Sequence, residues 1–281
     1  MYNKVQNRNI RQSQKDMKTI ICISDLHIGV RKKESNYTQR MFGKISESYP
    51  GIPILITGDL TNSATLRQFR KARRLLDNLA QTNPILAVPG NHDYAWKGSI
   101  PKPTGRQLWA EYLGSPLGWQ RKPVPWMGVN NEPKGIEGLG VWKDGPLVYF
   151  GIDSGINKNK EISARGFISP PMADALFSSL KKYAGKTRIV FLHHHPFNKR
   201  FFTRLHGSRM LLETLENNCE LLLFGHKHKY GIWWKSRGVP LIVSSHKSTK
   251  ALSGDCLMVT IIDIHKPGTT DVSFCHRLEA F

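Results

Sequence analysis

Short apolar runs alternate with a helical pattern through the N-terminal third of the chain. Three runs rich in β-branched residues end at small or polar residues, as buried strands do: TIICIS (19–24), GIPILI (51–56) and PILAV (84–88). Between the second and third runs, apolar residues recur at helical spacing, at Leu66, Phe69, Ala72, Leu75, Leu76 and Leu79. This alternation predicts βαβ units and a mainly parallel sheet.

The C-terminal half repeats the strand pattern with fewer helices. Strands are predicted at LVYFGI (147–152), RIVFL (188–192), ELLLF (220–224), VPLIVS (239–244) and LMVTIIDI (257–264). Two helices are predicted, over 170–185, where prolines come first and a glycine last, and over 209–218. Because only turns separate the last strands, we expect antiparallel pairing there.

Residues 95–146 break the alternation. They are rich in Gly, Pro and Trp and keep no period, which predicts a loop or lid insertion with a short helix at GRQLWAEYL (105–113).

Residues 1–18 are polar and basic and predict a flexible tail, so the predicted domain is 19–281. No run approaches the roughly 18 apolar residues of a transmembrane helix, and the N-terminus lacks the apolar centre of a signal peptide. We therefore expect a cytoplasmic protein.

The chain is strongly basic, which bears on the partners it could bind. Lys and Arg number 41 against 21 acidic residues, a formal net charge of +20. Such an excess favours an anionic partner, which could be nucleic acid, an anionic membrane surface or a phosphorylated substrate, although solubility alone also explains it. The sequence says nothing about the oligomeric state.

Clusters of Asp, Asn and His follow the predicted strands. They are SDLH (Asp25, His27), GDLTN (Asp59), GNHD (Asn91, His92, Asp93), FLHHHP (His193, His194, His195) and FGHKH (His226, His228). Ligands bind at the carboxyl ends of strands in open α/β sheets, and residues two apart point to the same side of an extended segment. Oxygen and imidazole ligands without cysteine suit Mn²⁺, Fe or Zn²⁺. Two such ions about 3.5–4 Å apart form a clamp for in-line displacement at phosphorus.

The order DLH, GDLTN, GNHD, LHHHP, GHKH resembles the calcineurin-like metallophosphoesterases over about residues 19–265. The style of LHHHP and GIDS is nearest to the cyclic-nucleotide phosphodiesterase branch of that family. The resemblance implies an α/β fold, a four-layered αββα sandwich of two mixed sheets around a dinuclear metal site. It also implies two divalent ions, with Mn²⁺ in first place and Fe or Zn²⁺ as alternatives.

The resemblance also implies roles for individual residues. Asp25, His27 and His228 would bind the first metal, Asp59 would bridge both, and the second would be bound by Asn91, His193 and His226. His92 would protonate the leaving oxygen or stabilise the transition state, and Asp93 would orient it. A hydroxide held between the metals would attack phosphorus in line, while Asn91 and His92 hydrogen-bond the developing charge.

The residues after the first histidine of LHHHP are candidates for substrate contact. His195 would line the pocket or brace the turn before Pro196. The loop that follows is basic and must start at the metal site, so it is predicted to contact an anionic substrate through Lys199, Arg200 and Arg204.

Three functions fit these residues. The first is a phosphodiesterase acting on a phosphoester such as a small nucleotide. The second is a nuclease or a nucleotide-linked lipid pyrophosphatase of the same superfamily, although such pyrophosphatases read GNRD where this chain reads GNHD. The third is a non-catalytic scaffold, which is disfavoured because all seven ligand positions are filled.

Overall fold

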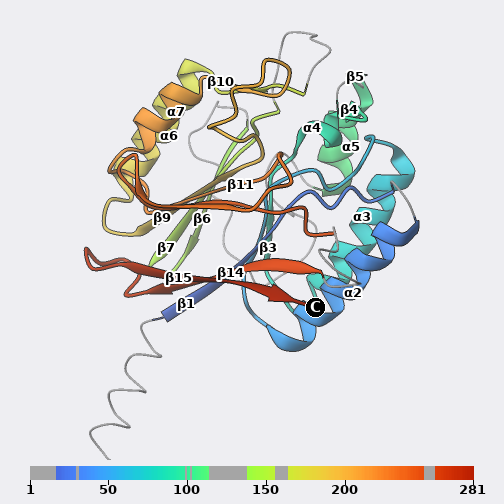
Figure 1. Cartoon of the computed structure of the whole chain (residues 1–281), viewed down its shortest axis with the longest axis horizontal. Coiled ribbons are helices and arrows are strands. Elements are labelled where there is room, and N and C mark those ends of the chain that lie inside the picture. Colours follow the sequence, from blue (N-terminus) through green and yellow to red (C-terminus); the bar gives the residue numbers. More distant parts are fainter. Residues whose placement is uncertain are drawn as a thin grey trace, which may run out of the picture.

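The computed structural model of the 281-residue chain describes residues 17–29, 32–98, 100–101, 103–113, 138–155, 164–249 and 257–281 (Figure 1). Residues 1–16 of the predicted tail lie outside the described residues, and its last two residues already belong to the first strand. Within the described ranges, no helix combines the length and the apolar character needed to cross a bilayer.

The first sheet has five strands in the order β15-β14-β1-β2-β3. Their bounds are β1 (Met17–Ile23), β2 (Ile54–Ile56), β3 (Ile85–Ala87), β14 (Met258–His265) and β15 (Ser273–Ala280). The three N-terminal strands are parallel, as their separation by helices predicts, whereas β14 and β15 are antiparallel.

The second sheet has six strands in the order β12-β13-β11-β9-β7-β6. They are β6 (Leu139–Asp144), β7 (Leu147–Ile152), β9 (Thr187–Leu192), β11 (Leu221–Phe224), β12 (Gly231–Ser236) and β13 (Val239–Ser244). The antiparallel expectation holds for β12, but β11 pairs in parallel with both β9 and β13.

The expected loop over 95–146 is wrong for residues 139–144. They form β6, which pairs antiparallel with β7 through a tight turn. The predicted short helix is present as α5 (Pro103–Leu113), while residues 114–137 of that region lie outside the described residues.

Helices cover the outer face of each sheet (Figure 1). α2 (Lys32–Ser48), α3 (Leu66–Leu79) and α5 lie on the first sheet, and α6 (Pro170–Lys182) and α7 (Ser208–Leu215) on the second. Two of them begin at capping hydroxyls, because Thr65 and Ser169 accept hydrogen bonds from the N–H groups of Gln68 and Met172.

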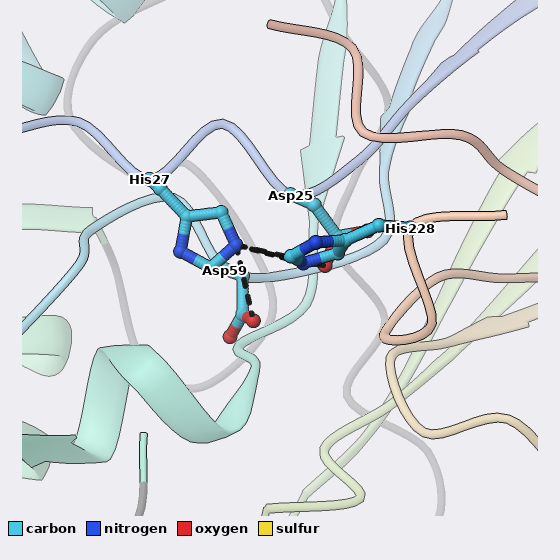
Figure 2. A group of neighbouring side chains, drawn as sticks. All are labelled: Asp25, His27, Asp59 and His228. Atoms are coloured by element: carbon cyan, nitrogen blue, oxygen red, sulfur yellow. Dashed lines mark hydrogen bonds and ion pairs between the residues drawn. The ribbon is translucent and has the colours of Figure 1, made fainter. Parts of the chain in front are cut away.

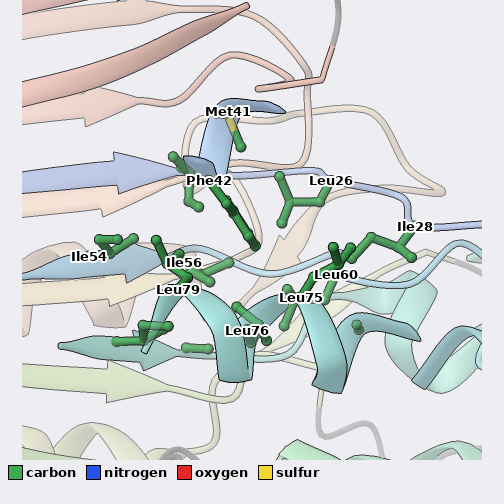
Figure 3. Close-up of a cluster of buried hydrophobic side chains, with 14 of the residues drawn as sticks. Leu26, Ile28, Met41, Phe42, Ile54, Ile56, Leu60, Leu75, Leu76 and Leu79 are labelled. Carbon is green, nitrogen blue, oxygen red and sulfur yellow. The ribbon is translucent and has the colours of Figure 1, made fainter. Parts of the chain in front are cut away.

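Three apolar clusters separate the four layers. In β1, Ile21 and Ile23 belong to the cluster beneath the helices, whereas the alternate residues Ile20 and Cys22 pack against the second sheet. Figure 3 shows part of the first cluster, in which Ile54 and Ile56 of β2 lie near Leu76 and Leu79 of α3. A third cluster joins the second sheet to α6 and α7. The fold is therefore the expected αββα sandwich of two mixed sheets.

Short elements surround the carboxyl ends of the central strands. They are α4 (Asn91–Tyr94), β4 (Ala95–Trp96), β5 (Ile100–Pro101), β8 (Gly166–Phe167) and β10 (Leu205–His206). β4 pairs with β5, and β8 pairs with β10.

Candidate metal centre

The seven predicted metal ligands meet where β1, β2, β3, β9 and β11 end. Five of them are buried and two are half-buried: Asp25, His27, Asp59, Asn91 and His193, then His226 and His228. The first sheet supplies the carboxylates and the amide, and the second supplies three of the histidines. The sequence argument from strand ends therefore predicted the right set of neighbours.

A first cluster contains Asp25, His27 and His228, with Asp59 beside it (Figure 2). One ligand atom from each of these four residues lies within 4.8 Å of all the others. The Nε2 atoms of His27 and His228 are 3.0 Å apart, and His228 Nε2 is 3.2 Å from Asp25 Oδ1.

A second cluster contains Asn91, His193 and His226. Asn91 Oδ1 lies 3.1 Å from His193 Nε2 and 3.0 Å from His226 Nδ1. The two imidazole nitrogens are 3.2 Å apart. One oxygen and two nitrogens thus converge on a common point, the donor set that a divalent ion such as Mn²⁺, Fe²⁺ or Zn²⁺ accepts.

Asp59 connects the two clusters. Its Oδ2 lies 3.8 Å from His27 Nε2 and 3.2 Å from His193 Nε2. Its Oδ1 accepts a hydrogen bond from the main-chain N–H of His92 at 2.9 Å, which fixes the orientation of the carboxylate. One carboxylate oxygen therefore faces both ligand sets, the geometry that a bridging ligand requires.

Five of the seven residues have a left-handed backbone. The φ angles are 55° at Asp25, 46° at His27, 54° at Asp59, 74° at His226 and 53° at His228. Residues other than glycine seldom adopt this conformation, and such residues cluster at functional sites. The expectation that each Asp-x-His or His-x-His pair shares a side because its segment is extended is wrong. The left-handed turns, not a strand, direct these side chains inward.

Neighbouring loops hold these turns in place. The N–H groups of Asp25 and His27 donate to the carbonyls of Gly58 and Asp59 at 3.1 and 2.9 Å. A side chain at Gly90 would collide with Asp59, since a Cβ there would lie 2.1 Å from Asp59 Oδ1. The motif glycine is therefore required by the close approach of the next loop.

The buried charges favour a cation. Burial opposes ionisation of Asp25, but the neighbouring histidines, His228 first, lower its pKa to about 2. Likewise, His193 and His92 outweigh burial and hold the pKa of Asp59 well below its usual range. Burial would lower the pKa of His193, yet the Asp59 carboxylate raises it to about 9. Two ionised carboxylates thus share one protonated imidazole, and a bound cation would displace that proton.

The imidazoles of His27 and His226 are neutral and suited to coordination. Burial lowers the pKa of both His27 and His226 to about 3. Among the described residues, Asp25 Oδ1 is buried without a hydrogen-bond donor of normal geometry. Since a buried carboxylate oxygen needs a partner, this atom and the converging nitrogens fit metal ions.

His92 borders the first cluster without belonging to it. Its ring meets the His27 ring edge-on, with centroids 4.5 Å apart. Its Nδ1 lies 2.7 Å from the main-chain carbonyl of Asn62, so Nδ1 carries the proton and donates it. The carbonyl of Asn62 therefore orients this imidazole, the task that was expected of Asp93.

Asp93 has a different position from the one expected. Its carboxylate accepts hydrogen bonds from the main-chain N–H groups of Gly90, Leu60 and Thr61 at 2.9, 3.2 and 2.7 Å. Burial, together with the charge of Asp59, raises the pKa of Asp93 to about 6. Asp93 thus joins the loops after β2 and β3, and its contribution to the site is structural.

The three consecutive histidines divide into three roles. His193 joins the second cluster, and His194 Nδ1 is bonded to Ser154 Oγ at 2.9 Å. His195 accepts a hydrogen bond from the N–H of Phe197, and its ring packs on Phe224 with centroids 4.6 Å apart. His195 thus braces the turn, the alternative to the predicted substrate contact.

The basic loop after these histidines reaches the site through its main chain. The carbonyl of Thr203 lies 3.1 Å from His226 Nε2. Lys199 and Arg200 are exposed and Arg204 is half-buried, and among the interactions described here none joins them to the metal ligands. The contact between this loop and the ligand clusters is therefore made by a main-chain carbonyl.

The chain is similar to known proteins both in its sequence profile and in its fold. The sequence profile of the calcineurin-like phosphoesterases matches residues 18–230. A dimetal phosphatase from Danio rerio has a TM-score of 0.64 at 11% identity, covering 92% of this chain and 98% of its own. GAP50, the anchor in the inner membrane complex of Plasmodium, has a TM-score of 0.50 at 10% identity, covering 90% and 85%.

The calcineurin-like phosphoesterase YfkN from Bacillus subtilis gives a TM-score of 0.48 at 13% identity, covering 94% of this chain and 90% of its own. No curated protein sequence matches the chain. At these identities the structures with TM-scores of 0.64 and 0.50 show a similar fold and nothing more, whereas the profile covers most of the sequence. The chain belongs to the calcineurin-like phosphoesterase family.

Proposed function

We propose that the chain is a dinuclear metal-dependent phosphodiesterase. The observation that carries the proposal is the position of Asp59, whose Oδ2 faces a ligand nitrogen of each cluster, at 3.8 and 3.2 Å. Two divalent ions bound there would neutralise phosphoryl charge and supply a deprotonated water for in-line attack. Mn²⁺ is the proposed ion, with Fe or Zn²⁺ as alternatives, because the donor set holds oxygen and imidazole but no thiolate.

His92 is the proposed proton donor. Because Nδ1 is committed to the Asn62 carbonyl, the ring can hold or release a proton at Nε2. The half-buried ring stands beside the first cluster, within reach of a leaving oxygen that approaches from that side. Asn91 Nδ2 donates one of its two hydrogens to the Gly98 carbonyl, and its second hydrogen would support the developing charge from the same turn of α4.

A diester substrate is supported by motif style, because LHHHP and GIDS resemble the cyclic-nucleotide phosphodiesterase branch. The second candidate is a nuclease or a nucleotide-linked pyrophosphatase, favoured by the net charge of +20 and the basic loop after His195. A non-catalytic scaffold is disfavoured, since the seven ligand positions are occupied by suitable side chains that converge.

The test compares bis(p-nitrophenyl) phosphate with p-nitrophenyl phosphate as substrates of the purified, Mn²⁺-loaded protein. Faster cleavage of the diester, lost in Asp59→Asn, would support a phosphodiesterase and justify trials of cyclic nucleotides, DNA and RNA. Preference for the monoester would indicate a phosphatase. No cleavage of either compound, with both metals bound, would leave a narrow pyrophosphatase or a scaffold.

A second variant isolates the proton donor. His92→Ala should keep both metals while the rate falls roughly 100-fold or more, because general acid catalysis contributes about 10²–10⁴. Metal content is read by elemental analysis beside the rate. Loss of a metal in this variant would contradict the assignment of His92 as a residue outside the coordination shell.

A further inference from the structure

A pair of exposed phenylalanines lies in the loop beside the second cluster. Phe201 and Phe202, here named the Phe tip, are 57% and 67% exposed. These are the highest values among the large hydrophobic side chains of the described residues. Adjacent exposed aromatic side chains of this size are seldom left in water, and they often mark an interaction surface.

Hydrogen bonds within the loop hold the Phe tip outward. The Asn198 side chain donates to both the carbonyl and the hydroxyl of Thr203 at 2.8 Å. The N–H of Thr203 in turn donates to the carbonyl of Arg200 at 3.0 Å. The two rings meet at 88° with centroids 5.2 Å apart. The tip is therefore a preformed projection.

Cationic side chains surround the Phe tip. Arg165 donates to the carbonyl of Phe201 at 2.7 Å, and its guanidinium lies 3.8 Å from the centre of that ring. The guanidinium of Arg204 lies 5.2 Å from the same centre. Lys199 and Arg200 come just before the tip, and no acidic residue occurs between Pro196 and Leu212.

We propose that the Phe tip is a docking site for an anionic lipid surface, with the phenyl rings entering the interface and the surrounding cations binding lipid phosphates. Apolar residues rimmed by Lys and Arg bind such surfaces by burying area and by attraction to anionic head groups. The proposal concerns binding alone, so it does not depend on the proposed phosphodiesterase activity.

Single-stranded nucleic acid fits this surface less well. Such ligands stack successive bases on exposed aromatic faces. The guanidinium of Arg165 already occupies one face of the Phe201 ring, so a base could not stack on that face. Two perpendicular rings suit insertion between lipid head groups better than stacking.

The experiment measures co-sedimentation of the full chain with vesicles of phosphatidylcholine, alone or mixed with phosphatidylserine. We compare the natural protein with Phe201→Ala/Phe202→Ala and with Phe202→Trp, which keeps an interfacial aromatic. Phe177→Ala, on the 43% exposed Phe177 of α6, is the matched control. All these variants keep the net charge, so a difference reports the apolar contribution.

We expect binding that requires phosphatidylserine and weakens at least about tenfold in the double variant. Phe202→Trp and Phe177→Ala should bind like the natural chain. Equal binding by the double variant would overturn the proposal, because charge alone would then explain the affinity. Weakened binding of a single-stranded oligonucleotide by the double variant, with vesicle binding unchanged, would also overturn it, in favour of a stacking site.

Discussion

The two ligand clusters differ in how firmly their side chains are held. In the second cluster, each ligand uses its remaining polar atom on a main-chain carbonyl. His193 Nδ1 lies 2.8 Å from Thr57 O, His226 Nε2 lies 3.1 Å from Thr203 O, and Asn91 Nδ2 donates to Gly98 O at 2.8 Å. These contacts fix the ring orientation and the amide direction before any ion binds.

The first cluster is held less completely. Among the described residues, His27 Nδ1 is buried without a hydrogen-bond partner. The His228 side chain is 40% exposed. Of its three members, Asp25 is the one fixed firmly, because its Oδ2 accepts from Ser24 Oγ at 2.6 Å and from the N–H of His226 at 3.2 Å. The comparison indicates a preorganised second site and a looser, more accessible first site.

Removing the Asp59 carboxylate, which faces both clusters, should weaken metal binding at both sites and so abolish the difference between them. Asp59→Asn removes the negative charge that faces His27 and His193. We expect at least one metal to be lost and the rate to fall by about 10³ or more. Elemental analysis and the diester assay measure both quantities. Two tightly bound metals with full activity would show that Asp59 does not connect the clusters.

The clusters should also bind metal unequally. We expect an Mn²⁺ titration of the metal-free protein to give two affinities that differ by roughly 10–100-fold, as the loss of orienting contacts does at other metal sites. His193→Ala should remove the tighter step and His228→Ala the weaker one. Calorimetry or electron paramagnetic resonance follows the steps.

His195→Ala is the matched control for this titration, since it alters the same histidine run and should keep both metals. Two equal affinities in the natural protein would contradict the inference that the second site is preorganised and the first is looser. Loss of a metal in His195→Ala, with retention in His193→Ala, would reverse the assignment of the histidine run.

The smallest effect concerns His195, which belongs to neither cluster. Burial, and then the charge of Lys227, lower the pKa of His195 from 6.5 to about 4. A lowered histidine pKa means that the unfolded chain binds the proton more readily. The folded state therefore loses stability as the pH falls from 6.5 towards 4, by about 1–2 kcal/mol after allowing for solvent screening.

His195→Phe should remove that loss. Lowering the pH from 7 to 4.5 should reduce the free energy of unfolding of the natural protein more than that of the variant. Urea titrations at both pH values measure the two free energies of unfolding. The variant also lacks the hydrogen bond from the N–H of Phe197, which lowers its free energy of unfolding by the same amount at both pH values. An unchanged difference would mean that His195 is not buried in the aromatic cluster.

Helix α3 could be predicted from its helical apolar period, and eight strands could be predicted because each is a short apolar run: β1, β2, β3, β7, β9, β11, β13 and β14. α2 carries such a signal too, since Tyr37, Met41, Phe42 and Ile45 are buried on one face, but polar residues around them hide it. β6 could not be predicted from its own residues. Its sequence LGVWKD becomes a strand through the pairing with β7.

The convergence of the Asp, Asn and His side chains could be predicted, but their local geometry could not. Strand ends and residue types identify Asp25, Asp59 and His193, because parallel strands bring their carboxyl ends together. The hydrogen bond that orients His92 comes from a main-chain carbonyl of Asn62. Every residue carries such a carbonyl, so the sequence gives no sign of which one is used.

The left-handed turns at the ligands also limit how this chain can vary during evolution. A substitution at position 25, 27, 59, 226 or 228 must satisfy both the chemistry and a positive φ angle. Asp, Asn and His enter that conformation far more often than other side chains, and β-branched residues hardly ever do. A relative that bound no metal would therefore still be confined at these positions to residues that tolerate a positive φ, such as Asn or Gly. The positive φ angles at these positions would then remain as a structural mark of the site even where no metal binds.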